Sequence, residues 1–171
     1  MFIKTLAGSD DGRGAERLAA DLGRLERRLL RVYDDVNCRG RLERYRELFP
    51  AAQAPQSQPA DAGASRLLGE LLPLSQVLIG LGYFDVALQS AEIAANHAPG
   101  WEAQLTRAFL LALLGETETA EELYVEAHHA LGQIPGEALG QLEELVATHP
   151  DEEDLAELHM RLMLLAPTDQ A

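Results

Sequence analysis

The chain has 171 residues, of which 47% are apolar, and this length and composition suffice to bury a hydrophobic core without disulfides. Its formal net charge of −14 repels the phosphates of nucleic acids and of anionic membranes, which disfavours both as ligands of the body of the protein. Because the chain has a single cysteine, Cys38, no signal-peptide pattern at its start and no apolar run near the roughly 18 residues that span a bilayer, we expect a soluble cytoplasmic protein without membrane insertion.

Charge is distributed unevenly along the chain. Residues 1–50 contain 11 of the 14 Lys and Arg residues against 9 acids, whereas the remaining residues contain 3 bases and 19 acids. Two segments of such different charge are most simply interpreted as two modules, which can attract each other or recruit different partners. The bases of the first module alternate with acids, as they do on the solvated flanks of a coiled coil, so we expect no nucleic acid as a partner.

Residues 1–50 are predicted to form a coiled-coil-like helical hairpin. Apolar residues recur at alternating spacings of four and three from Ala15 to Val36, the pattern of a helix packed lengthwise on another helix. Turn-favouring residues follow at 37–40, and a second, shorter apolar stripe runs to Phe49 before Pro50 ends it. A seam that is not covered within the chain would produce a homodimer. The seam residues are Leu18, Leu22, Leu25 and Leu29.

Residues 51–64 are rich in proline and alanine and hold almost no large apolar side chain, so they are predicted to form a semi-extended linker. The remainder, residues 65–171, shows helical periodicity and no alternation over five positions that would indicate a strand. Glycine and proline mark the ends of six predicted helices. These helices cover residues 65–81, 83–97, 101–114, 117–131, 136–147 and 152–165.

An internal repeat relates the predicted helices. Three small residues recur after 33 positions, namely Gly82 as Gly115, Ala87 as Ala120, and Ala94 as Ala127. Alanines spaced by seven lie on one face of a helix, where their size lets two helix backbones approach closely. The pattern resembles the tetratricopeptide repeat, a helix-turn-helix unit of about 34 residues with a glycine-containing turn and small residues on its second helix.

The resemblance implies an all-α fold in which the N-terminal hairpin precedes a tetratricopeptide-like array of α-hairpins, wound as a right-handed superhelix over residues 65–171. This array would contain two recognisable repeats and a degenerate third helix pair. In that family the first helix of each repeat lines a concave groove that binds a partner protein. By position, the groove residues would be Leu72, Gln76, Ile79, Glu102, Leu105, Phe109 and Ala112.

The expected groove is mostly apolar. Family members that hold the acidic C-terminus of heat-shock chaperones use a clamp of Lys, Arg and Asn, to which only Arg107 could contribute here. An apolar or amphipathic helical ligand is therefore favoured. For a single residue such as Leu105 or Phe109, packing within its own hairpin remains an equally good interpretation.

A small acidic tetratricopeptide protein of this length also resembles the chaperones of bacterial type III secretion, which hold secreted subunits until export. The hairpin ahead of the array is similar to the paired needle-subunit chaperones, in which a small helical hairpin packs on a tetratricopeptide protein. The resemblance implies a cytoplasmic chaperone or adaptor that holds an amphipathic helical partner. The alternative is a structural or scaffolding protein that oligomerises through the hairpin seam.

No convergent set of polar groups predicts an enzyme, a metal site or a cofactor. Glu126 with the pair His128-His129 gives one Glu-x-x-His, half of a di-iron signature, without a second copy. Cys38 is expected in a turn amid arginines that could lower its thiol pKa, but no histidine lies near it in the sequence to act as a base. The sequence has no phosphate-binding loop of the Gly-Lys-Ser/Thr type. We therefore expect a binding protein that needs no cofactor.

Overall fold

A computed structural model of the chain describes residues 10–53, 60–98 and 100–165. Over these residues it contains eight helices and no strand, which confirms the all-α class. The helices are α1 (Asp10–Tyr33), α2 (Val36–Gln53), α3 (Ala60–Gly80), α4 (Phe84–His97), α5 (Trp101–Leu113), α6 (Thr117–Leu131), α7 (Gly136–Thr148) and α8 (Glu153–Leu165).

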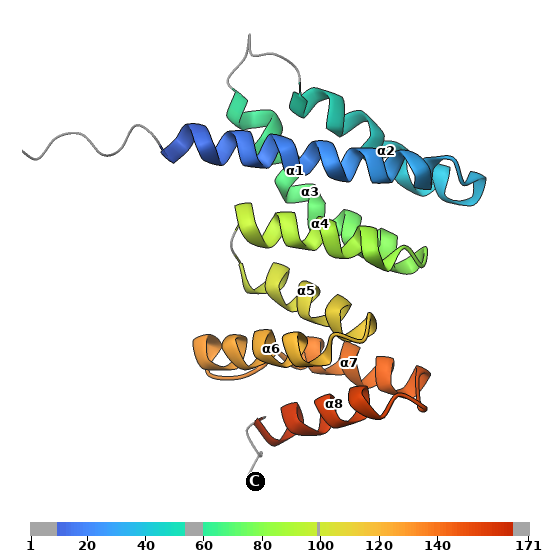
Figure 1. Cartoon of the computed structure of the whole chain (residues 1–171), viewed down its shortest axis with the longest axis vertical. Helices are drawn as coiled ribbons and strands as arrows, with labels where there is room; N and C mark the ends of the chain where they lie inside the picture. The colour runs from blue at the N-terminus through green and yellow to red at the C-terminus, as the bar shows by residue number, and fades with distance from the viewer. Residues whose placement is uncertain (1–9, 54–59, 99, 166–171) are drawn as a thin grey trace, which may run out of the picture.

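The helices stack along one long axis, with α1 and α2 at one end and α8 at the other (Figure 1). Each helix from α1 to α5 packs on the next, α5 packs on α6, and α7 packs on α8. Further contacts join α1 to α4, α5 to α7 and α6 to α8. Along the stack, α2 therefore lies beside α3, α1 beside α4, α5 beside α7 and α6 beside α8.

Two local predictions for the N-terminal half are wrong. The turn expected at residues 37–40 is helical, because the backbone N–H groups of Cys38 and Arg39 donate to the Asp35 carbonyl at 3.1 and 3.2 Å and start α2. Helix α2 also continues beyond Pro50, since a proline removes one hydrogen bond without preventing helical dihedral angles in the residues that follow.

The described parts of the predicted linker at 51–64 are helical. Its first residues belong to α2, and its last residues form the first turn of α3, where alanine, the best helix former, recurs at Ala60, Ala62 and Ala64. Residues 54–59 lie outside the described residues. The proline content suggested an extended spacer, whereas the alanine content favoured helix.

A glycine follows α3 and α5 in the same conformation, which explains why Gly82 recurs as Gly115 in the repeat. Gly82 and Gly115 have φ angles of 82° and 86°, a left-handed conformation that side chains disfavour. The N–H of Tyr83 donates to the Leu78 carbonyl at 2.9 Å, and the N–H of Glu116 donates to the Leu111 carbonyl at 2.8 Å. These six-residue closures satisfy carbonyls that a helix end would otherwise leave unpaired.

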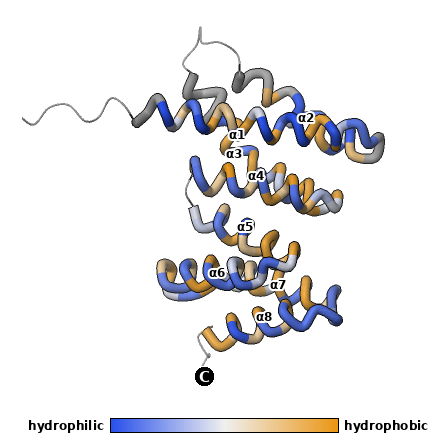
Figure 2. The backbone as a smooth tube through the Cα atoms, in the orientation of Figure 1, coloured by the Kyte–Doolittle hydropathy of each residue, from blue (hydrophilic) through white to orange (hydrophobic). Residues whose placement is uncertain are grey.

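The repeated alanines lie at the helix contacts. Ala87 and Ala120 are both fully buried, and so is Ala127. Hydrophobic residues alternate with hydrophilic ones along the helices (Figure 2). The buried ones form two clusters, one from α1 to α5 and the other from α5 to α8. Two buried serines form hydrogen bonds between α3 and α4. Ser75 donates to the Ala87 carbonyl at 2.9 Å, and Ser90 donates to the Leu71 carbonyl at 2.8 Å.

The N-terminal hairpin docks on the array. The seam residues Leu22, Leu25 and Leu29 are buried, Leu18 is partly buried, and all of them belong to the core that includes α3 and α4. Hydrogen bonds and ion pairs between the hairpin and the helices α3 and α4 surround this contact. Arg28 pairs with Asp85 and donates to Gln89 at 3.1 Å, Arg44 pairs with Glu70 at 3.0 Å, Tyr83 donates to Asp35 at 3.1 Å, and His97 bonds Asp21 at 2.9 Å.

We predict that Gly115→Ala lowers the free energy of unfolding by about 1 kcal/mol, because a Cβ disfavours the left-handed conformation. Gly140→Ala is the matched control, since Gly140 lies inside α7 with open space around an added Cβ and should be stabilised slightly. Urea denaturation of both variants measures the difference. Equal effects would contradict the role assigned to the turn.

Ala120→Leu is expected to destabilise the protein by roughly 1–3 kcal/mol, because a fully buried helix contact has no room for three more carbons. Ala130→Leu on the exposed face of the same helix serves as control. Thermal unfolding followed by circular dichroism compares the two. A neutral Ala120→Leu variant would show that this helix contact is not closely packed.

Docking of the hairpin should weaken in acid. The hydrogen bond from His97, helped by Arg24, holds the pKa of Asp21 below its ordinary value of 3.8, against the opposing effect of burial. The ionised carboxylate therefore stabilises the fold above that value, and this contribution is lost as the pH falls through the lower folded pKa. Asp21→Asn should lower stability near pH 6 and have little effect near pH 2. Urea denaturation at both pH values, with exposed Asp34→Asn as control, tests this expectation.

Candidate functional site

Helices α3, α5 and α7 share a face with an open hollow of about 260 Å³. The apolar residues that line it are Trp101, Leu105, Pro135 and Ala138. The polar ones are Gln76, Glu102, Thr106, Glu137 and Gln141. The three helices are the first members of the pairs α3 with α4, α5 with α6, and α7 with α8.

The first turns of α5 and α7 position most of this lining. Gly100, in extended conformation, precedes α5 and sets Trp101 at its first position, while Pro135 precedes α7. Glu102 and Glu137 are the second residues of these two helices. Acidic residues in a first turn are stabilised by the partial positive charge of the helix N-terminus, which explains why both helices begin with one.

The structure brings three of the seven predicted groove residues together, namely Gln76, Glu102 and Leu105. Leu72, Ile79 and Phe109 are half-buried and pack against the core, as the more conservative interpretation of such residues expected. Ala112 is fully buried, so its placement in the groove is corrected. Helical spacing puts it on the side of α5 that meets the core, where only a small residue fits.

Six lining residues were not predicted. They are Trp101, Thr106, Pro135, Glu137, Ala138 and Gln141. The 33-residue offset could have found two of them, because it carries Leu105 onto Ala138 and Glu102 onto Pro135. The third helix pair lacks the repeated small residues, so no groove residue was assigned to it.

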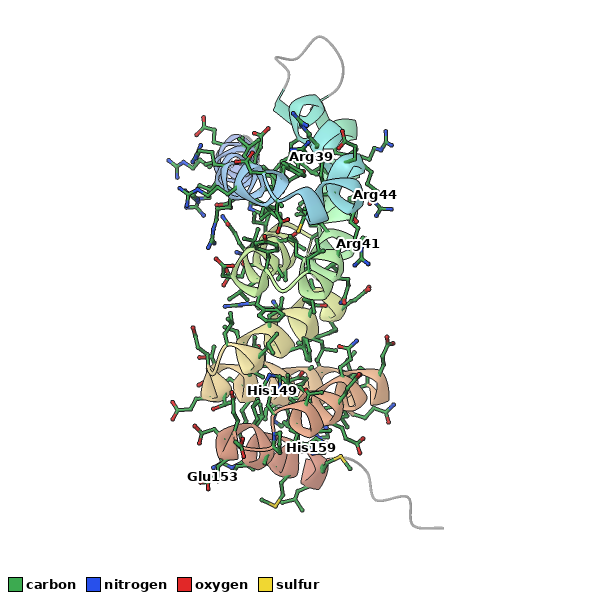
Figure 3. The ribbon with its side chains drawn as sticks, turned by 90° about the vertical axis from the view of Figure 1, so that its right-hand side faces the viewer. Arg39, Arg41, Arg44, His149, Glu153 and His159 are labelled. Carbon is green, nitrogen blue, oxygen red and sulfur yellow. The ribbon has the colours of Figure 1, made fainter. Side chains whose placement is uncertain are left out.

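The two ends of the stack differ in chemistry. Arg39, Arg41 and Arg44 lie on α2 at one end of the stack (Figure 3). His149, Glu153 and His159 lie near the other end. The last helix also exposes apolar side chains away from its buried stripe. Met160, Met163 and Leu164 are exposed to 61%, 50% and 82%. The charged hairpin thus covers one end of the stack, whereas at the other end the face of α8 that carries these three residues is exposed.

The reactive side chains singled out in the sequence are placed as follows. Cys38 is buried in α2, and burial is the main cause that raises its thiol pKa, so the expectation of a lowered pKa in a turn is wrong. The rings of His128 and His129 are arranged edge to face, with 5.8 Å between their centroids. Within residues 10–53, 60–98 and 100–165, no group of three or more His, Cys, Asp or Glu could hold a metal ion.

Comparison with known proteins adds no relative to this description. No family model, no curated protein and no solved structure matches the chain. Over the part of the chain that the structure describes, none of the helices combines the length and the apolar character needed to cross a bilayer. Inference about function therefore depends on the hollow and on the surfaces around it.

Proposed function

We propose that this protein is a protein-binding adaptor or chaperone whose helices form a tetratricopeptide-like, right-handed superhelical array and hold an amphipathic helix of a partner on the face of α3, α5 and α7. The observation that carries the proposal is the hollow that residues of all three helices line together. A site shared by successive helix pairs exists only when those pairs are stacked, as in a repeat array.

The chemistry of the hollow supports a protein ligand. At about 260 Å³ it is smaller than the roughly 300–1,000 Å³ pockets that enclose small molecules, and it is open to solvent. Its apolar residues, such as Leu105 and Ala138, can receive a few side chains of a partner, while Gln76 and Gln141 offer hydrogen bonds around them. An amphipathic helix presents this combination of apolar and polar groups on one face.

The docked hairpin supports the comparison with type III secretion chaperones, in which a small helical hairpin packs on a tetratricopeptide protein. We propose the corresponding role here, that of a cytoplasmic chaperone for a secreted or helical subunit. The alternative, a scaffold that dimerises through the hairpin, would use Leu22, Leu25 and Leu29. These residues are buried within the chain, so an intermolecular coiled coil requires the hairpin to leave α3 and α4.

Site-specific crosslinking in the native host tests the proposal. A photoreactive amino acid placed at Gln76 or Gln141, both exposed at the hollow, should form an adduct with a partner protein. The same group at Glu122, which is exposed on α6 and does not line the hollow, should not. Adding Leu105→Glu should reduce the adduct severalfold, because it puts a charge into the apolar part of the hollow.

The folding of each variant is checked by circular dichroism before crosslinking. Adducts of equal yield from Gln141 and Glu122 would contradict binding at this face. The absence of any adduct at Gln76 and Gln141, with folded protein in both cases, would overturn the proposed function.

A further inference from the structure

The hollow carries more negative charge than its role as an apolar groove requires. Among its lining residues Glu102 and Glu137 are acidic, and the structure places no Lys, Arg or His in this described lining. The chain beyond residue 64 contains three bases, Arg66, Arg107 and Arg161. Arg107 lies 3.8 Å from Glu92, and Arg161 pairs with Glu121 at 2.9 Å, so these two are engaged away from the hollow.

The two helix N-termini at the hollow do not cancel this charge. Each N-terminus is equivalent to roughly half a positive elementary charge, and α5 and α7 both begin here. Glu102 and Glu137 each carry a full negative charge within the same first turns. The sum is close to one negative charge, so the hollow attracts a cation rather than an anion, and the acidic body of the protein reinforces this preference at longer range.

Trp101 supplies the feature that selects the kind of cation. Trp101 is half-buried, comes directly before Glu102 in the sequence, and lines the hollow together with Glu137. A planar guanidinium can stack on an indole ring while its N–H groups donate to carboxylates, a combination that a compact ammonium matches less well. Gln76 and Gln141 add neutral acceptors at the same opening.

We propose that the hollow is an anchor for an arginine side chain of an amphipathic partner helix, with Trp101 stacking on the guanidinium and Glu102 and Glu137 accepting its hydrogen bonds. This inference rests on the proposed function, because it names the chemistry of the partner held at the same face. The apolar positions of the partner helix then lie against Leu105 and Ala138, and its arginine provides orientation and register.

The probe is an amphipathic helical peptide of about 16 residues, built from Leu, Ala and Gln with one central arginine, and its counterpart with citrulline, a neutral isostere. Trp101 is the only tryptophan, so its fluorescence reports binding at the hollow directly. We expect the arginine peptide to bind about tenfold more tightly than the citrulline peptide.

The variants separate this anchor from general electrostatics. The double variant Glu102→Gln with Glu137→Gln should remove most of the arginine preference, measured as the ratio of the dissociation constants of the two peptides. Glu118→Gln is the matched control, because Glu118 is the second residue of α6 but lies outside the hollow. This control should retain the preference.

Each outcome decides between the two proposals. Equal binding of the two peptides, or an arginine preference that survives the double variant, overturns the arginine anchor and leaves the peptide-binding face standing. Failure of both peptides to bind folded protein overturns the anchor, and together with absent crosslinks at Gln76 and Gln141 it overturns the proposed function as well.

Discussion

The stack depends on how closely its helices approach one another. Fully buried Ala87 and Ala120 lie on α4 and α6, and a larger side chain at either position would hold the neighbouring helices apart. Single helices of this length are marginal in water, so each pair gains stability only by burying its apolar face on the next pair. Left-handed Gly82 and Gly115 reverse the chain between the two helices of a pair, α3 with α4 and α5 with α6.

The N-terminal hairpin covers the apolar faces of α3 and α4 at one end of the stack. An array of helix pairs would leave the outer faces of α3 and α4 uncovered, and α1 and α2 bury those faces while presenting charged residues to solvent. The unequal charge of the two segments has a structural use, since Arg28 and Arg44 of the hairpin pair with Asp85 and Glu70 of the array. Such exposed pairs contribute modestly to stability and mainly orient the contact. The other end carries no comparable cover among the described residues, and there α8 exposes Met160 and Leu164.

The candidate site follows from the same geometry. Residues from the end of α3 and the beginnings of α5 and α7 line one hollow although they lie far apart in the sequence. Glu102 and Glu137 stabilise the starts of α5 and α7 and also give the hollow its charge, while Trp101 and Leu105 give it an apolar surface. One set of residues can therefore serve both helix formation and recognition of a partner.

By itself, the sequence determined the helical class, the bounds of the last five helices to within one or two residues, and the buried alanines, because periodicity, turn glycines and small-residue spacing act locally. Three of the seven residues predicted for a groove line the hollow, Gln76 from the first repeat and Glu102 and Leu105 from the second. Only the tertiary structure decided that Ala112 is core, that Cys38 lies buried in a helix, that the hairpin docks on its own chain, and that α7 contributes Glu137 and Gln141 to the hollow. Each of these depends on which helix faces which, and the packing of distant segments sets that choice.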